Sequence, residues 1–240
     1  MEKLVKLWTQ VKDNVEFVLI GTAIIVGLAL IAKIFQRFLP GMRKVSPARR
    51  ITIVAICAAI ATVLHILDFS IPFLAPEFYK LDFSELPVML CGFFLGPSAT
   101  VTCEAIKIIL KLMMKGTSTA FVGDFANFAV GCSLVLPAVI VYHTKKTRAS
   151  AMWGLVLGTV VLTVFGSAFN GIYLLPKFSQ LYKIPLDAII GMGSAINGGI
   201  TSISTFVMFA VAPLNLIKGT CVSVLTLLLY KRVARPLFGK

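Results

Sequence analysis

Asn215 and Lys218 are the side chains of this chain that are best placed to do chemistry. They are the two strongly polar residues in an otherwise almost wholly apolar stretch, Thr205 to Tyr230. A stretch of that length fits a membrane-spanning helix, where a charge costs roughly 3 kcal/mol and is seldom kept without a partner. Residues three apart share a helix face. The pair therefore predicts a binding function, and what Lys218 contacts becomes the central question.

A second amide, Asn170, lies near the outer end of the preceding apolar run. A carboxamide offers a donor and an acceptor side by side, which matches the edge of a heterocyclic amide or imide. Pro213 removes a backbone donor, so nearby carbonyls are free to accept from a ligand or a neighbouring helix. For either asparagine alone, an interhelical hydrogen bond is the simpler interpretation. Asn170, Asn215 and Lys218 taken together favour a binding site.

Other chemistry has little support in the sequence. No G-x-x-x-x-G-K-[ST], G-x-S-x-G or H-E-x-x-H motif occurs, so nucleotide hydrolysis by this chain alone is not expected. The five cysteines form no CxxC pair and are interpreted as packing thiols, and His65 and His143 occupy ordinary interfacial positions. We therefore expect no enzyme activity, no metal site and no cofactor.

The elements that must position these groups are membrane helices. The chain is 58% hydrophobic and 14% charged, against about a quarter charged in soluble domains. Its net charge of +13 comes largely from short basic segments that flank apolar runs, which is typical of cytoplasmic loops and not of a nucleic-acid surface. These segments are Arg37, Arg43, Lys44, Arg49 and Arg50, then Lys145, Lys146 and Arg148, then Lys231, Arg232, Arg235 and Lys240.

Hydropathy predicts an all-α integral membrane protein of the cell membrane, embedded in lipid. With the basic segments inside, the N-terminus falls outside and the C-terminus in the cytoplasm. Five apolar runs are clear spans: Val15 to Phe35, Ile51 to Leu67, Ala126 to Tyr142, Met152 to Leu175 and Thr205 to Tyr230. Between the second and third, Leu86 to Leu95 and Ser98 to Met114 form either two crossings or a re-entrant pair. We expect an N-terminal extension, 1–48, with one transmembrane helix, and a six-transmembrane-helix core, 49–240.

The loop Phe69 to Leu86 falls on the outer side and is rich in prolines and aromatic residues. Its sequence predicts an extended segment folded over the outer face, followed by Ser84 as a helix N-cap. Such a loop is suited to act as a lid, and an ordinary connector is the alternative.

Several motifs, in order, resemble the riboflavin-binding S components of energy-coupling factor (ECF) vitamin transporters, the RibU group. They are KLDFSELP from Lys80, FLGP from Phe94, EAIK from Glu104, KGTST from Lys115, GDFANF from Gly123, Asn170 with YLLP from Tyr173, and PLNLIKG from Pro213. The resemblance covers roughly Arg49 to Leu237.

The resemblance implies a six-helix S-component core that captures riboflavin from outside for ATP-driven uptake. Its partners would be a transmembrane coupling subunit and two cytoplasmic ATPases. The membrane would be that of a bacterial cell. The flavin ring would be held by Asn170 and Asn215 and by backbone groups of the outer loop at Leu81, Asp82 and Phe83. Lys218 would then contact the ribityl chain of the ligand and not a fixed carboxylate. Glu104 is the acid within the spans that would overturn this expectation by pairing with Lys218. Asn127 and Lys107 are lesser candidates for substrate contact.

The resemblance also implies docking to the coupling subunit through small residues on the first core helix. Ala55 and Ala59 fit the A-x-x-x-A pattern, with Ala58 and Thr62 alongside. No role is assigned to the extra N-terminal helix.

Two other classes stay open. One is a cation-coupled secondary transporter of a small vitamin-like molecule, with Glu104, Lys107 and Lys111 as coupling groups. Against it, Glu104 and Lys107 are three apart and can neutralise each other. The other is a membrane-embedded enzyme, which lacks an acid/base or metal constellation. The sequence leaves open whether FMN or flavin analogues are accepted and whether the coupling module is shared.

Overall fold

Long apolar helices dominate the computed structural model, which describes residues 15–39, 45–117, 119 and 121–238. Within these residues, five helical segments are long and apolar enough to cross a membrane, which confirms the five clear spans. They are α2 (Val15–Phe38), α3 (Pro47–Ile66), α6 (Val122–Lys145), α7 (Arg148–Phe169) with its extension to Tyr182, and α11 (Ala212–Phe238) with the short helices that precede it.

The middle pair consists of α4 (Glu85–Leu95) and α5 (Pro97–Lys115), joined at Gly96. Gly96 has φ 93°, a left-handed conformation that suits glycine at this tight junction. At 11 residues, α4 is roughly 16 Å long and cannot cross a hydrocarbon core of about 30 Å. Almost all of its residues are buried inside the bundle. The predicted count of six core spans plus one therefore stays a prediction.

Two helices are interrupted by π turns beside the candidate polar residues. The first, η1 (Asn170–Leu174), connects α7 to α8 (Leu175–Tyr182), and the second, η2 (Val207–Val211), lies between α10 (Ile203–Phe206) and α11. In η2 the backbone N–H of Ala212 donates to the carbonyl of Val207, just before Pro213, which has no N–H to donate. Such π turns frequently mark functional sites.

The outer segments contain structure that the hydropathy pattern did not predict. A short antiparallel pair, β1 (Phe69–Ser70) and β2 (Lys80–Leu81), sets Phe69 opposite Leu81. The region after α7 also holds α8 and a further short helix, α9 (Leu186–Ser194). Ser84 precedes α4 as predicted, but its side chain makes no capping bond. Instead its hydroxyl accepts a hydrogen bond from Lys107 Nζ at 3.0 Å.

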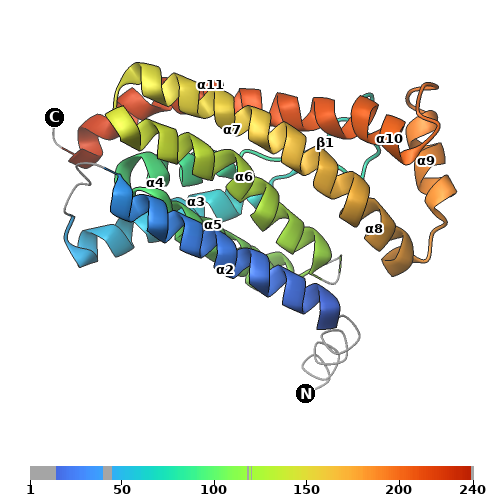
Figure 1. Cartoon of the computed structure of the whole chain (residues 1–240), viewed down its shortest axis with the longest axis horizontal. Helices are drawn as coiled ribbons and strands as arrows, with labels where there is room; N and C mark the ends of the chain where they lie inside the picture. Colours follow the sequence, from blue (N-terminus) through green and yellow to red (C-terminus); the bar gives the residue numbers. More distant parts are fainter. Residues whose placement is uncertain (1–14, 40–44, 118, 120, 239–240) are drawn as a thin grey trace.

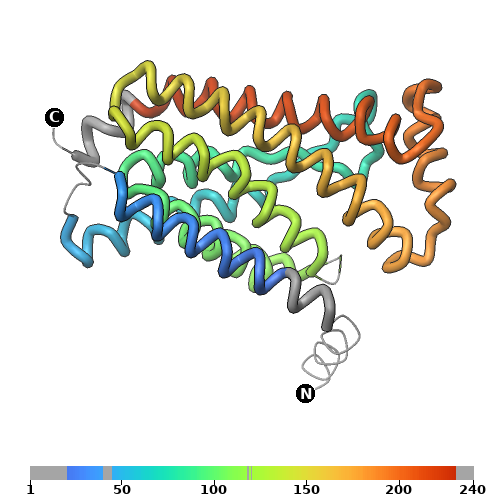
Figure 2. The backbone as a smooth tube through the Cα atoms, viewed as in Figure 1, coloured from blue at the N-terminus to red at the C-terminus, as the bar shows by residue number. Residues whose placement is uncertain are grey.

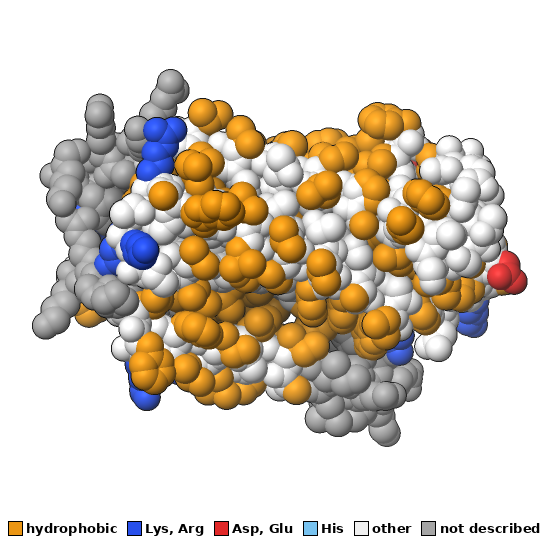
Figure 3. Space-filling view, turned by 45° about the horizontal axis from the view of Figure 1, so that its top comes forward, with side chains coloured by type: hydrophobic (Ala, Val, Ile, Leu, Met, Phe, Trp, Pro, Cys, Tyr) orange, Lys and Arg blue, Asp and Glu red, His pale blue; other side chains and the backbone are white. Residues whose placement is uncertain are grey.

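The helices form an elongated bundle (Figures 1 and 2). The end of α2, the α6–α7 turn and the end of α11 lie at one end, with α8 and α9 at the other (Figure 1). Among the described residues, Arg37 lies in the last turn of α2 and Lys145, Lys146 and Arg148 flank the α6–α7 turn, so this end of the bundle is basic. Hydrophobic side chains cover much of the face in between (Figure 3), and large ones such as Trp153 and Val164 are exposed. An apolar exterior of this kind suits lipid contact.

Helix α2 packs against the bundle along α5 and α6. Ala32 is fully buried in a cluster with Val101, Ile108 and Phe128. At the basic end, Gln36 Oε1 accepts a hydrogen bond from the backbone N–H of Ser98 at 2.9 Å, in the first turn of α5. The extra N-terminal helix is therefore an integral part of the packed structure.

Candidate ligand cavity and its buried charge network

A cavity of about 660 Å³ opens among the outer loop, the start of α6, the α7–α8 junction and α11. This volume lies within the usual range for small-molecule sites, about 300 to 1,000 Å³. Asn127, Asn170, Asn215 and Lys218 all line it. These four come from three different helical segments, and Asp82 of the outer loop lines the cavity as well, so the structure brings together five of the predicted site residues.

The two main amides have different hydrogen-bonding states. Asn170 is satisfied by protein: its Nδ2 donates to the Gly166 carbonyl at 2.7 Å, and its Oδ1 accepts from the Tyr79 hydroxyl at 2.9 Å. Burial raises the pKa of Tyr79, so the phenol keeps the proton that it donates. Asn215 Nδ2, in contrast, is buried and has no hydrogen-bond partner among the residues that the structure describes. An unpaired buried donor costs about 1 to 3 kcal/mol, so Asn215 offers an unused donor at the cavity wall.

Gly166 makes room for that amide. A Cβ atom at this position would lie 2.8 Å from Asn215 Nδ2, which is closer than side chains normally approach. The glycine on α7 therefore allows the α11 amide to approach the backbone that binds Asn170. Only the Asn215 amide depends on this close approach, because the bond from Asn170 Nδ2 to the Gly166 carbonyl joins residues four apart in one helical segment.

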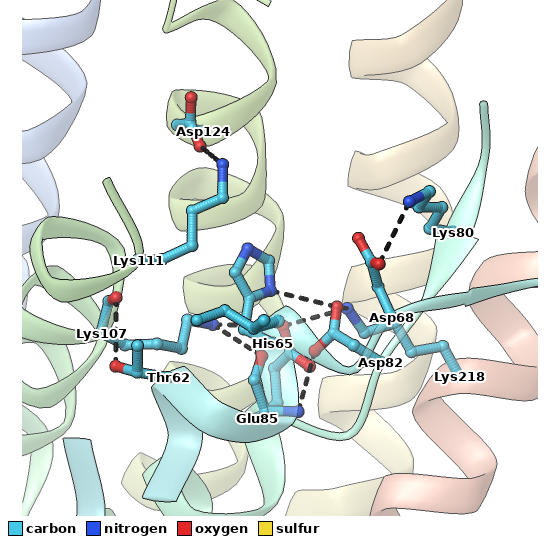
Figure 4. A network of polar contacts seen from close by, with 12 residues as sticks. Thr62, His65, Asp68, Lys80, Asp82, Glu85, Lys107, Lys111, Asp124 and Lys218 are labelled. Carbon is cyan, nitrogen blue, oxygen red and sulfur yellow. Dashed lines mark hydrogen bonds and ion pairs between the residues drawn. The ribbon is translucent and has the colours of Figure 1, made fainter. Parts of the chain in front are cut away.

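Lys218 is held by fixed carboxylates, which corrects the expectation that its partner is the ligand alone. Its Nζ lies 3.0 Å from Glu85 Oε1 and 3.2 Å from Asp82 Oδ2 (Figure 4). Glu104, the acid singled out in the sequence, is not its partner. The expectation was wrong because Asp82 and Glu85 lie outside the long apolar runs, and only the folded loop carries them inward to α11.

Glu104 and Lys107 form the ion pair that their spacing predicted. Both side chains are fully buried, with Lys107 Nζ at 2.5 Å from Glu104 Oε1 and 3.5 Å from Glu85 Oε1. Thr62 on α3 donates its hydroxyl proton to the Lys107 carbonyl at 3.3 Å. Lys107 does not line the cavity, so its suggested role in substrate contact is corrected to one inside the network.

Asp82 connects the outer loop to two helices. Its Oδ2 lies 3.3 Å from His65 Nδ1 on α3 as well as near Lys218 on α11, and its Oδ1 accepts from the Ser84 backbone N–H at 2.8 Å. Burial opposes ionisation of Asp82, but the Lys218 ammonium and the His65 ring outweigh it and hold the pKa of Asp82 well below its usual range. The carboxylate is thus ionised near neutral pH.

The polar rim of the cavity carries more exposed ion pairs. Asp68 lies 3.1 Å from Lys80 Nζ and 3.3 Å from Lys115 Nζ, and all three side chains are partly exposed. Lys111, by contrast, pairs with Asp124 on α6 in a largely buried contact and also donates to the Gly116 carbonyl at 3.0 Å. The exposed Asp68 pairs contribute little to stability.

Leu81 and Phe83 are not among the residues that line the cavity, so a ligand contact through their backbone groups stays a prediction. Lys80 and Asp82 do line it. Alternate residues of an extended segment point to opposite sides, so when Lys80 and Asp82 face the cavity, Leu81 and Phe83 face away. Leu81 is buried, and Phe83 lies beside Phe69 with ring centroids 6.0 Å apart.

His65, Tyr79 and Glu85 are the functional candidates that sequence reasoning missed. His65 and Tyr79 line the cavity, and Glu85 holds Lys218. The available signal was positional: His65 ends a span on the outer side, next to the acid-bearing loop. Nothing in the local sequence showed which loop residue would meet it.

The predicted docking set on α3 divides into two faces. Ala55 and Ala59 are exposed, while Ala58 and Thr62 are buried inside the bundle. The inclusion of Ala58 and Thr62 in an exposed docking face is therefore corrected: at about 100° per residue, Ala58 lies about 60° around the helix from Ala55, and here that places Ala58 and Thr62 on the side packed against the bundle.

Comparison with known proteins agrees with this architecture. Residues 49–230 match a family model described as the substrate-specific component of ECF transporters. The chain is 32% identical over 186 residues to the riboflavin transporter RibU of Staphylococcus aureus, covering 78% of this chain and 90% of the relative. It is 28% identical over 183 residues to the riboflavin transporter FmnP of Bacillus subtilis, covering 76% and 90%.

A solved structure is also similar. It is described as the S component of a bacterial ECF transporter and superimposes with a TM-score of 0.62 at 34% identity, covering 80% of this chain and 99% of that chain. Taken with the helical bundle and its polar cavity, these similarities show that the chain belongs to the family of substrate-specific components of ECF transporters.

Proposed function

We propose that this protein captures riboflavin from outside the cell and holds it in the cavity lined by Asn170 and Asn215. The observation that carries the proposal is the unused Nδ2 donor of Asn215 at the wall of a cavity of suitable size. Riboflavin is uncharged and flat, and its pyrimidine edge presents alternating donors and acceptors. Amides can pair with that edge while apolar walls such as Leu174, Val211 and Leu214 cover the ring.

The relatives support the substrate assignment because both are named as riboflavin transporters. As an S component, the chain would work with a transmembrane coupling subunit and two ATPases that supply the energy. The exposed Ala55 and Ala59 on α3 are the proposed docking positions, since small residues let two helices approach closely.

The same proposal includes orientation and domain division. The basic end of the bundle would face the cytoplasm, with the cavity open to the outside and the N-terminus outside. Residues 1–48 would form the extension, and 49–240 the substrate-binding domain. The cation-coupled alternative loses support, because Glu104 and Lys107 are paired with each other and do not line the cavity.

The proposal is tested by titrating the detergent-purified protein with riboflavin and following the quenching of flavin fluorescence. We expect one flavin per chain and a weaker affinity for Asn215→Ala. Asn197→Ala is the matched control, since Asn197 is an exposed asparagine that does not line the cavity. No quenching at micromolar riboflavin would refute the substrate assignment. Uptake that persists without the partner ATPases would favour a secondary transporter instead.

A further inference from the structure

The protein groups that pair with Lys218 lie in the outer loop and at the start of the helix that follows it. Asp82 is in the loop and Glu85 begins the helix that follows it, and they approach within 3.2 and 3.0 Å of Lys218 Nζ. They lie 136 and 133 positions away in the chain. Since the exposed rim pairs are weak, these buried contacts are the strong polar connection between the loop and the last helix.

Most other attachments of the loop to the bundle are apolar contacts: Ala75 is fully buried in a cluster with Phe206, and Leu81 is buried as well. Ser84 adds a polar contact, since its hydroxyl accepts a hydrogen bond from Lys107 Nζ at 3.0 Å. The β1–β2 pair consists of two residues on each side and lies within the loop itself. Lys80 and Asp68, which pair across it, are partly exposed. The Tyr79 hydroxyl contacts Asn170, and His65 meets the same Asp82 oxygen as Lys218. The carboxylate of Asp82 is therefore the point where α3, the loop and α11 meet (Figure 4).

The buried network around this contact contains more carboxylates than ammonium groups. Asp82, Glu85 and Glu104 supply three carboxylates, while Lys107 and Lys218 supply two ammonium groups. Lys107 is already engaged by Glu104 and Ser84. If Lys218 were removed, the loop carboxylates would be left buried with too little positive charge, and moving the loop out to water would relieve them.

We propose that Lys218 is a positioning residue: with Asp82 and Glu85 it forms a clasp that keeps the outer loop closed over the cavity. The clasp acts on the ligand by holding the loop, and it determines how long a bound molecule stays. A direct contact between Lys218 and the ligand is not required for this effect. The proposal deepens the riboflavin assignment and rests on it for one of its two readouts.

The first readout needs no ligand. Hydrogen–deuterium exchange of residues 69–84 in the full-length, detergent-purified protein is compared for the wild type, Lys218→Met, Asp82→Asn and the double variant. We expect at least tenfold faster exchange in each single variant. The double variant should match the singles, because both substitutions break the same clasp. Glu77→Gln is the control: Glu77 is an exposed acid in the same loop that does not line the cavity, and this variant should exchange like the wild type.

The second readout is the riboflavin dissociation rate from the same four proteins. We expect dissociation at least tenfold faster with a nearly unchanged association rate, and again no further increase in the double variant. Lys218→Arg, which keeps the charge, should restore most of the slow dissociation. If wild-type protein binds no riboflavin but loop exchange follows the expected pattern, the clasp holds and only the substrate assignment fails.

Unchanged loop exchange in both single variants would overturn the proposal. So would additive effects on dissociation, because they would mean that Lys218 and Asp82 contact the ligand independently. If Lys218→Met fails to fold, Asp82→Asn and Lys218→Arg still decide the matter: normal loop exchange in Asp82→Asn would overturn the clasp.

Discussion

Replacing Asn215 by leucine should make the free protein more stable and riboflavin binding weaker. The Nδ2 atom of Asn215 is buried and has no hydrogen-bond partner among the described residues, whereas Asn170 uses both ends of its amide. Leucine has a similar size and needs no partner. Asn170→Leu should do the opposite to stability, because it leaves the Gly166 carbonyl and the Tyr79 hydroxyl unpaired.

The magnitudes follow from the cost of an unpaired buried polar group, about 1 to 3 kcal/mol. Asn215→Leu removes such a group, so the free energy of unfolding should rise by about 1 kcal/mol, or roughly 2 to 4 °C in Tm for a domain of this size. In the complex the same change leaves a flavin polar group unpaired. That should raise Kd by roughly 5- to 140-fold, at about 1.4 kcal/mol per factor of ten. Asn170→Leu should lower the free energy of unfolding by about 2 kcal/mol or more.

The assay combines thermal unfolding in detergent, without ligand, with a fluorescence titration of the same samples. The opposite signs for the two asparagines are the diagnostic result. If Asn215→Leu is less stable than the wild type, its amide has a partner in the free protein, and the reasoning fails. Unchanged riboflavin affinity in Asn215→Leu would show that the amide does not hydrogen-bond to the ligand.

Three further predictions are tested by riboflavin titration, by unfolding and by the rate of riboflavin dissociation. Gly166→Ala places a Cβ atom 2.8 Å from Asn215 Nδ2 and should weaken riboflavin binding about tenfold. Gly27→Ala is the control: a Cβ atom there meets no atom within 4 Å, so binding should be unchanged. Equal titration curves for the two variants would contradict the role of the close approach at Gly166. Lys107→Met leaves Glu104 and Glu85 buried with too few cations, so it should lower the free energy of unfolding by about 3 to 5 kcal/mol. Adding Glu104→Gln should recover part of this loss. A single variant as stable as the wild type would argue against the network. Because the pKa of Asp82 is lowered in the folded protein, its ion-pair contribution is present above the unfolded pKa of about 4 and is lost only as pH falls through the folded value. Riboflavin dissociation should therefore not accelerate between pH 8 and pH 5, and acceleration within that window would show that Asp82 is not the ionised member of the clasp.

Much of the fold was predictable because membrane helices are encoded locally. A run such as Ala126 to Tyr142 must form a helix at bilayer depth, since no other structure satisfies its backbone in lipid, and α6 confirms this. The π turns at Asn170–Leu174 and Val207–Val211 were not predicted. They depend on how the helices pack around the cavity, although Pro213 marks the place where one of them ends.

The candidate site was predictable only in part, for a related reason. Asn170, Asn215 and Lys218 stood out because polar groups in apolar runs are costly, and the structure places all three at one cavity. Leu81, Asp82 and Phe83 were named together because of the family resemblance, and sequence proximity does not reveal that only Asp82 of the three lines the cavity. His65 did not stand out in this way, since a histidine at the end of a span is ordinary.

The sequence by itself determined that this chain is a membrane protein of the ECF S-component type, and that polar groups gather toward one side of the membrane. These properties follow from hydropathy, charge distribution and ordered motifs, which are read along the chain. Only the tertiary structure decided what Lys218 contacts. Its partners Asp82 and Glu85 are more than 130 positions away, and their approach depends on the joint packing of the outer loop, α4 and α11. A buried charge requires a partner, but the sequence states only the requirement, and the fold selects the residues that meet it.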